Sequence, residues 1–492
     1  MTAKASTGAA AYQPHIGLEI HVQLITDSKV FCQCRNAFGD RPNENVCPVC
    51  LGYPGILPAL NREAVLGAYV LARALGCTLS TRTVFERKNY FYPDLPKNYQ
   101  ISQFGAPVGR DGAFTAEVDG SPTTVGIREV HLEEDAGKMI HAGDISLLDY
   151  NRTGTPLVEV VTQPELTGAT AAEQFLEEFR RMVRFLGVCD GNMEQGSLRC
   201  DANVSVNRAG AGLGSKVEIK NLNSFKFVRN ALAFEIGRQT AVLAAGGAVR
   251  VETRLWNENR DCTEPMRVKE SEDDYRYFPE PDLPPFCPDE AFFAAVEERQ
   301  VELPLARRDR LREQHAVTAQ QAAFLTAEPD TADFFERTVA AGADASLAAR
   351  WLGADIRGHL NQRRETLAAS HLTPERLAAL LAMLVRGEVN GKIAKQVLAK
   401  VIVEDRDPEA VVEQDGLRQI TDSGELRPIL ERIVAGNPRV AAQIAAGERK
   451  PAGFLVGQVM RHTAGRAHPD QVHALIEALY EPARTGESRD DG

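Results

Sequence analysis

The stretch from His15 to Leu24 reads His-Ile-Gly-Leu-Glu-Ile-His-Val-Gln-Leu, with an apolar residue at every second position. Such alternation predicts a β-strand with one buried face, because successive side chains on a strand point to opposite sides. The other face would carry Glu19 and His21 side by side. Carboxylate oxygen suits hard divalent cations and imidazole can complete such a site, but a half-exposed strand with a polar outer face explains the same pattern.

A second predicted strand, residues 125–135, ends in three consecutive acids. Alternation places Glu133 on the same face as His131, whereas Glu134 falls in phase with the apolar Leu132. If the strand ends by residue 132, either glutamate could turn inward. Neighbouring carboxylates repel one another, and a bound cation would offset that repulsion. Solvated charge at a strand end is the alternative explanation.

Three further segments repeat the alternation. Residues 150–161 predict a turn and then a strand with Glu159 among valines, and residues 198–206 place Asp201 on a polar face. Residues 216–220 give another short strand with an acid at its centre. A sheet would bring these polar faces together, so the segments jointly predict a metal or phosphate site.

Four of the nine cysteines lie close together, as the pairs Cys32 and Cys34, and Cys47 and Cys50. Two close pairs on two turns can supply four thiolates at tetrahedral corners, which is the geometry of a structural Zn²⁺ site. Disulfides or free thiols are the alternatives, and a reducing compartment disfavours disulfides. The spacing therefore predicts structural zinc bound by an insertion at residues 32–50.

Residues 86–100 contain two prolines and four aromatic residues, a composition that predicts a rigid loop rather than a helix or a central strand. With Arg87, Lys88 and Lys97, such a loop suits contacts to phosphate and to a base or sugar. An aromatic loop packed over the sheet, with solvated lysines, is the alternative.

The length of 492 residues predicts several domains, and the five prolines between Pro279 and Pro288 indicate a boundary. Alternating patterns precede that boundary and helical periodicity follows it; Thr170 and Glu173 predict a capping box for one helix within the first part. The predicted divisions are a disordered tail at 1–14, a first domain at 15–288, a helical domain at 289–408, a tail domain at 409–482 and a disordered tail at 483–492.

The net charge of −12 argues against nonspecific nucleic-acid binding but leaves room for a local basic patch. Residues 437–470 carry five basic and two acidic side chains. These could form a nucleic-acid patch or an ordinary solvated face. No run of 18 apolar residues and no signal-peptide core occurs, so we expect no membrane association and a cytoplasmic protein.

Several long motifs, taken in order, resemble the B subunit of the aspartyl/glutamyl-tRNA amidotransferase. They are Ile-Gly-Leu-Glu-Ile-His (16–21), Arg-Lys-Asn-Tyr-Phe-Tyr-Pro-Asp (87–94), His-Leu-Glu-Glu-Asp-Ala-Gly-Lys (131–138), Gly-Ser-Leu-Arg-Cys-Asp-Ala-Asn (196–203), Lys-Asn-Leu-Asn-Ser-Phe (220–225), Tyr-Arg-Tyr-Phe-Pro-Glu-Pro-Asp (275–282) and Gly-Phe-Leu-Val-Gly-Gln (453–458). The similarity spans nearly the whole chain after its first fourteen residues.

The resemblance implies an α+β fold: a cradle domain around an antiparallel sheet with flanking helices, then an all-α domain and a small helical tail that contacts tRNA. It implies that ATP and Mg²⁺ activate the side-chain carboxylate of misacylated Glu-tRNA(Gln) or Asp-tRNA(Asn), and that ammonia then forms the amide. Only some family members carry the zinc cysteines. The matching positions are Glu19, His21 and Glu134 for magnesium, Glu133, Glu159 and Asp201 as less certain members of the acidic pocket, and Lys88 for nucleotide phosphate.

Two absences from the sequence agree with this family. It contains no Gly-x-x-x-x-Gly-Lys-Ser/Thr loop, so a nucleotide must bind in another way, and no Gly/Ser-rich amidase signature that could release ammonia from glutamine. The resemblance implies that a glutaminase A subunit supplies ammonia and that a small C subunit completes a heterotrimer. The competing hypothesis is a noncatalytic, zinc-containing tRNA-binding subunit.

Overall fold

The computed structural model describes residues 12–267 and 272–480. The predicted tail at 483–492 and most of the predicted tail at 1–14 lie outside these residues. Tyr12, Gln13 and Pro14 do not belong to a tail, because β1 (Tyr12–Gln23) begins with them. Their pairing with β10 (Leu198–Arg208), which places Pro14 opposite Val206, explains why the strand starts earlier than the sequence predicts.

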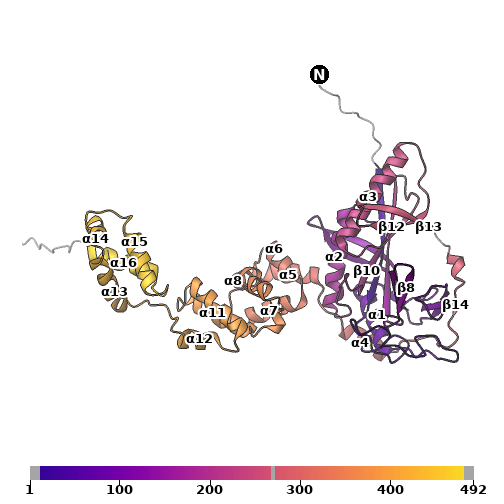
Figure 1. Cartoon of the computed structure of the whole chain (residues 1–492), viewed down its shortest axis with the longest axis horizontal. Helices are drawn as coiled ribbons and strands as arrows, with labels where there is room; N and C mark the ends of the chain where they lie inside the picture. The colour runs from indigo at the N-terminus through magenta and orange to yellow at the C-terminus, as the bar shows by residue number, and fades with distance from the viewer. Residues whose placement is uncertain (1–11, 268–271, 481–492) are drawn as a thin grey trace, which may run out of the picture. The chain divides into compact units, whose positions relative to one another are not determined.

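A nine-stranded sheet forms the centre of the N-terminal part, in the order β13-β12-β11-β10-β1-β9-β6-β5-β2 (Figure 1). Its pairs are antiparallel except for β11 with β12. Apart from β1 and β10, the strands are β2 (Thr78–Leu79), β5 (Gly109–Val118), β6 (Ser121–Glu134), β9 (Pro156–Thr162), β11 (Val217–Lys220), β12 (Glu252–Asn257) and β13 (Cys262–Arg267).

The alternation of β1 divides the sheet into an apolar and a polar face. Ile16, Leu18, Ile20 and Val22 are fully buried in the core, whereas Glu19 and His21 are only partly buried. Three helices pack on the core side: α1 (Arg62–Ala74), α2 (Ala169–Phe185) and α3 (Phe225–Ala244). The predicted strand face of Glu19 and His21 is therefore the face that these helices leave uncovered.

Side-chain caps explain where two of the three covering helices begin. The Asn61 side chain accepts hydrogen bonds from two amides of α1, and Ser224 accepts one from Phe227 in α3. The predicted capping box at Thr170 is wrong: α2 starts earlier, with Gly168 at its N-cap and no side-chain cap. Glu173 instead accepts a hydrogen bond from Arg229 of α3, which takes it away from the helix end.

The aromatic segment 86–100 is more regular than predicted. Its ends form β3 (Glu86–Asn89) and β4 (Tyr99–Ser102), which make a small sheet with β14 (Phe278–Pro279), while the proline-rich middle stays irregular. A separate hairpin joins β7 (Lys138–Ala142) to β8 (Ile145–Asp149).

The first compact unit ends at Arg307, beyond the predicted boundary at residue 288. The reason is α4 (Glu290–Glu298), which packs on α1 and buries Phe292 and Val296 in the core of the sheet domain. The proline-rich stretch before α4 is thus a connection within this unit.

The second unit, residues 308–492, is helical where it is described and contains two apolar cores. Helices around the first core are α5 (Pro304–His315), α6 (Ala319–Leu325), α7 (Pro329–Ala340), α8 (Ala345–Trp351), α9 (Arg357–Arg363), α10 (Pro374–Val385), α11 (Gly391–Val403) and α12 (Pro408–Gln414). Those around the second are α13 (Ser423–Ala435), α14 (Pro438–Ala445), α15 (Ala452–His462) and α16 (Pro469–Tyr480).

The predicted α+β class, an antiparallel sheet with flanking helices followed by a helical region, is confirmed. Within the described ranges, no helix combines the length and the apolar character that crossing a bilayer would require.

Candidate functional site

A row of polar side chains crosses three neighbouring strands on the uncovered face of the sheet. His21 of β1 lies opposite Glu159 of β9, and Glu159 lies opposite His131 of β6. The Glu159 carboxylate is 3.0 Å from Nε2 of His131 and 3.7 Å from Nε2 of His21. The register of the sheet thus joins groups that are far apart in the sequence.

Glu133 adds a second carboxylate to this row. It lies two positions beyond His131 on the same face of β6, 3.7 Å from Nε2 of that histidine, and it accepts a hydrogen bond from Ser102 Oγ at 3.0 Å. Ligand atoms of His21, Glu133 and Glu159 all lie within 4.8 Å of one another. Two carboxylates and an imidazole at this separation match the ligand types that bind divalent cations.

A second acidic group lies beside the first on the same sheet. Glu19 pairs across strands with Asp201, and together with Glu218 of β11 these residues bring ligand atoms within 4.8 Å of one another. Lys220 balances part of this charge, since its Nζ lies 2.6 Å from Asp201 and 3.1 Å from Glu218.

Positive charge also stands close to the first group. Burial disfavours a charged Lys88, but the carboxylates of Glu133 and Glu159 outweigh that cost and raise the pKa of Lys88 above its usual value. His131 behaves similarly: burial opposes protonation, yet the charge of Glu159 and hydrogen bonds to both carboxylates raise its pKa to about 10. Both side chains are therefore cationic at neutral pH, and the pKa of Glu159 is held far below its ordinary value despite burial, by His131, His21 and Lys88.

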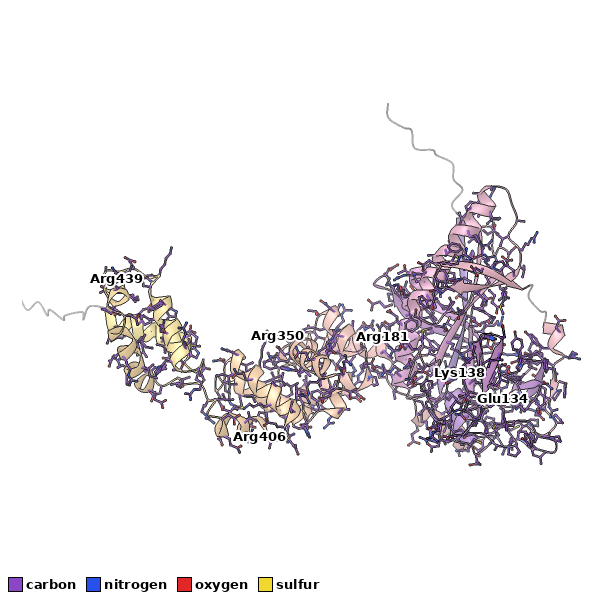
Figure 2. All side chains as sticks on the ribbon, in the orientation of Figure 1. Glu134, Lys138, Arg181, Arg350, Arg406 and Arg439 are labelled. Atoms are coloured by element: carbon purple, nitrogen blue, oxygen red, sulfur yellow. The ribbon has the colours of Figure 1, made fainter. Side chains whose placement is uncertain are left out.

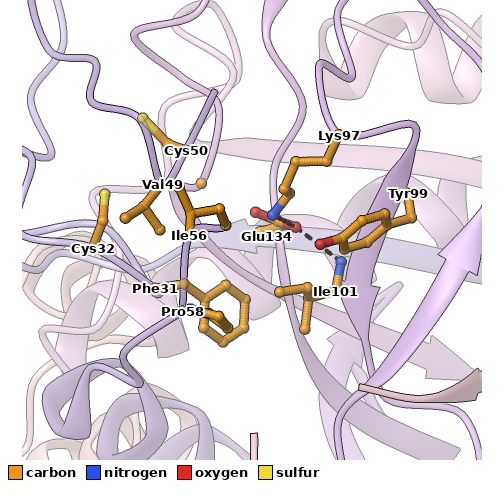
Figure 3. A pocket seen from close by; sticks show the side chains of 11 residues that line it. Phe31, Cys32, Val49, Cys50, Ile56, Pro58, Lys97, Tyr99, Ile101 and Glu134 are labelled. Atoms are coloured by element: carbon orange, nitrogen blue, oxygen red, sulfur yellow. Dashed lines mark hydrogen bonds and ion pairs between the residues drawn. The ribbon is translucent and has the colours of Figure 1, made fainter. Parts of the chain in front are cut away.

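Glu134 is not brought to this row. Its side chain lies in a separate cavity, where it accepts hydrogen bonds from Lys97 Nζ and from the Ile101 amide (Figure 3). Both members of the Lys97–Glu134 ion pair are buried. Alternation explains the separation, because Glu133 and Glu134 are consecutive on β6 and point to opposite faces.

The third acid, Asp135, has partners of its own. Its carboxylate accepts hydrogen bonds from Arg199 at 2.9 Å and from Gln23 at 2.7 Å, and Arg152 lies 3.6 Å away. Burial opposes ionisation, but Arg199 and Arg152 keep the pKa of Asp135 below its usual value. The repulsion expected among three consecutive acids is thus relieved by sending each side chain to different partners.

The four predicted zinc cysteines meet in one loop region. The Sγ atoms of Cys32, Cys34, Cys47 and Cys50 all lie within 4.8 Å of one another, and none of the four is in a disulfide. A set of four thiols fits a structural Zn²⁺, which binds four thiolates tetrahedrally and leaves no open position for catalysis.

Lys29 supports this cluster from the protein interior. It is fully buried, with Nζ 3.7 Å from Cys50 Sγ and hydrogen-bonded to the carbonyls of Asn45 and Tyr150. A hydrogen bond from Cys32 is the main cause that lowers the pKa of Cys50 to about 5 against burial, with further help from the Cys47 amide and the charge of Lys29. Cys50 is therefore held toward the thiolate form that a metal requires, whereas a hydrogen bond with Cys50 raises the pKa of Cys32 and burial raises the pKa of Cys34.

The structure places the three residues predicted to bind magnesium, Glu19, His21 and Glu134, in three different groups. His21, Glu133 and Glu159 form one group with Lys88 nearby, Glu19 and Asp201 form a neighbouring group, and Glu134 stands apart. Strand alternation placed His131 with Glu133 and predicted an acid, Glu218, at the centre of residues 216–220, but the residues assigned to the site included neither of these, nor Lys220 nor Lys29. The first three could have been found by extending strand alternation to every polar position, but nothing in the sequence marks Lys29.

Comparison with known proteins defines the class first. Residues 14–294 match the family described as GatB/GatE catalytic domain, and residues 333–479 match the GatB domain. The chain is therefore a component of a tRNA-dependent amidotransferase, a ligase.

Curated relatives identify which component it is. The chain is 44% identical over 94% of its length to the B subunit of the aspartyl/glutamyl-tRNA(Asn/Gln) amidotransferase of Carboxydothermus hydrogenoformans, covering 98% of that protein. It is 46% identical over 94% of its length to the same protein of Geobacillus thermodenitrificans, again covering 98% of the relative. The chain belongs to the family of aspartyl/glutamyl-tRNA(Asn/Gln) amidotransferase B subunits, as the sequence motifs predicted.

Proposed function

We propose that this protein uses ATP to phosphorylate the side-chain carboxylate of glutamate or aspartate esterified to tRNA, and that ammonia then converts the acyl phosphate to the amide. In the first step a carboxylate oxygen attacks the γ-phosphorus and ADP leaves. In the second, ammonia attacks the carbonyl carbon, inorganic phosphate leaves and the nitrogen loses a proton. The row formed by His21, Glu159, His131 and Glu133, with cationic Lys88 beside it, carries the proposal.

The chemistry requires compensation of negative charge. A carboxylate and a triphosphate repel each other, and phosphoryl transfer depends on positioning and on cationic groups near the transferred oxygens. Lys88 provides such a cation and is held protonated by Glu133 and Glu159. Mg²⁺, when bound, would neutralise phosphate oxygens, with His21, Glu133 and Glu159 as the ligands we propose.

The neighbouring group of Glu19, Asp201 and Glu218 offers further carboxylates on the same face. Asn203 donates a hydrogen bond to Glu19 at 2.8 Å and Lys220 pairs with Asp201, so these side chains are held in place. We propose that this carboxylate group borders the substrate and orients the reacting groups. The zinc cluster has no such role in this proposal. The four cysteines would bind Zn²⁺ structurally.

The partners we propose follow from what the sequence lacks. Because it has no amidase signature, ammonia must come from another protein, and we assign this to a glutaminase A subunit joined by a small C subunit in a heterotrimer. The family name includes both tRNA(Asn) and tRNA(Gln), and either or both would be substrates, in the cytoplasm where translation takes place. The match to a catalytic-domain family favours this enzyme over the noncatalytic tRNA-binding alternative.

The test is a pair of matched carboxylate-to-amide variants in the assembled enzyme. Glu159→Gln should lower ATP-dependent amide formation on misacylated tRNA by about a hundredfold or more, because removing a group that positions transition-state charge has effects of this order. Glu129→Gln, on the polar face of β6 but paired with Arg128, is the control. tRNA affinity should be unchanged in both; normal turnover by Glu159→Gln would refute the proposal.

A further inference from the structure

An aromatic cluster surrounds Lys88 next to the polar row. Lys88 Nζ lies 4.9 Å from the ring centre of Tyr275 and 5.9 Å from that of Tyr90, within the range of cation–π attraction. Tyr277 lies beside Tyr275, with ring centres 6.2 Å apart. Phe104 stacks on Tyr277, with centres 4.6 Å apart and planes inclined by 14°. Nothing in the phosphorylation or amidation chemistry uses this stack.

The backbone that carries Phe104 is fixed. The amides of Phe104 and Gly105 both donate to one carboxylate oxygen of Glu86, each at 2.7 Å. Arg110 donates from the other side to the carbonyls of the same two residues, at 3.3 and 3.1 Å. These contacts hold the backbone turn that carries Phe104.

The segment that carries Tyr277 is fixed as well. Asn89 donates to the carbonyls of Tyr275 and Arg276, and β14 pairs with β3 immediately after Tyr277. Arg87 then binds Glu280 through two hydrogen bonds of 2.6 and 2.8 Å. The two segments that carry the rings are thus each held by polar contacts of their own, and the rings stack between them.

Exposure distinguishes this stack from a core contact. Phe104 is 46% exposed although Tyr277 stacks against it, so much of the phenylalanine ring is open to a ligand. A phenylalanine ring left partly exposed forgoes part of its hydrophobic stabilisation, and its open face can stack on a flat ligand. Burial raises the pKa of Tyr277 to about 12, with Lys88 opposing and Glu133 and Glu159 adding, so its phenol lies within the field of the reaction site.

We propose that the Phe104–Tyr277 stack is a platform for an adenine base, with Phe104 in direct contact with that base. The proposal rests on the proposed function, in which two reactants carry adenosine: ATP, and tRNA at its 3′ end. The aromatic contacts run from Phe104 through Tyr277 and Tyr275 to Lys88, so a base on Phe104 would share one cluster with the lysine proposed to bind phosphate. Aromatic stacking suits this role because it binds the flat face of a base without needing hydrogen bonds to its edge.

The experiment compares Phe104→Ala with Phe104→Trp in the assembled enzyme, using Phe234→Ala as the matched control. Phe234 is 38% exposed on α3, which packs on the core side of the sheet, away from Lys88. KM for ATP and KM for misacylated tRNA are measured separately, with kcat at saturation and the melting temperature. Phe104→Ala should raise one KM by about tenfold, in line with the loss of one base stack, while Phe104→Trp and Phe234→Ala leave both near wild type.

The arms of the test separate the two sources of adenosine. A raised KM for ATP alone assigns the platform to the nucleotide, and a raised KM for tRNA alone assigns it to the terminal adenosine. Unchanged KM values in Phe104→Ala, whether kcat falls or not, would overturn the platform. Because Phe104→Ala keeps His21, Glu133 and Glu159, that result would leave the proposed phosphorylation to be decided by the Glu159→Gln variant.

Discussion

The row of polar side chains on the sheet and the cysteine cluster are built in opposite ways. The row takes His21 from β1, Glu159 from β9, and His131 and Glu133 from β6, so it exists only when three strands pair in the correct register. The cysteine cluster takes all four of its members from residues 32–50. When strand pairing assembles a site, the sequence shows its members only as separate motifs. When one loop supplies all the members, the spacing of the residues predicts the site directly.

Glu133 and Glu134 connect the two regions. The first joins the polar row, and the second lines a cavity with Cys32 and Cys50, where it is paired with Lys97 (Figure 3). One step along β6 therefore changes a carboxylate from a proposed metal ligand to a member of a buried ion pair. The difference predicts that variants in the two regions fail in different assays.

The largest effect is expected at the cysteine cluster. Cys50→Ser should reduce bound zinc from about one per chain to near zero, because it removes one of four thiolates of a closed structural site. Metal analysis of the purified protein measures this. Cys77→Ser, a buried cysteine outside the cluster, should retain zinc. A wild-type protein without zinc would refute the assignment.

The buried ion pair gives the next effect. Lys97→Ala leaves Glu134 charged and buried, and we expect a loss of about 3–5 kcal/mol in the free energy of unfolding. The double variant Lys97→Met/Glu134→Leu removes both charges and should recover most of that loss. Denaturant unfolding of the three proteins measures both values. If the double variant is as unstable as Lys97→Ala, the loss of stability does not come from an unpaired buried charge, and the prediction is wrong.

A smaller effect is expected at Lys29, which supports Cys50 without belonging to the thiol set. Lys29→Met should weaken zinc affinity by about tenfold to a hundredfold, the usual cost of removing a group that orients metal ligands. Competition with a chelator gives the affinity. Since the cluster itself remains complete, zinc should still bind at saturation. Complete loss of zinc would indicate that the loop no longer folds.

The smallest effect per residue is expected in the helical tail. Arg439 on α14 is labelled in Figure 2, and it is exposed together with Arg449, Lys450 and Arg461. If these side chains bind tRNA phosphates, replacing all four by alanine should weaken tRNA affinity and reduce its salt dependence, by roughly one unit of slope for each phosphate-binding side chain removed. An unchanged salt slope would show that this patch is only a solvated face.

Strand alternation predicted which face of β1 and β10 is polar, because the side to which a strand residue points depends only on its position relative to its neighbours. It also placed Glu133 with His131, although family resemblance favoured Glu134. What the sequence could not supply is the partner of each polar group. Lys97 of one segment meets Glu134 of another, and Lys29 meets Cys50, only through tertiary packing.

The most direct test of the central claim measures Mn²⁺ affinity, with Mn²⁺ as a paramagnetic substitute for Mg²⁺, in the assembled enzyme. The compared variants are Glu133→Gln and the ion-pair replacement Lys97→Met/Glu134→Leu. If the catalytic cation binds on the polar row, Glu133→Gln should weaken Mn²⁺ binding by about tenfold or more, and the ion-pair replacement should leave it within about twofold of wild type. The reverse result, with Glu133→Gln normal and the Glu134 variant impaired, would contradict the account.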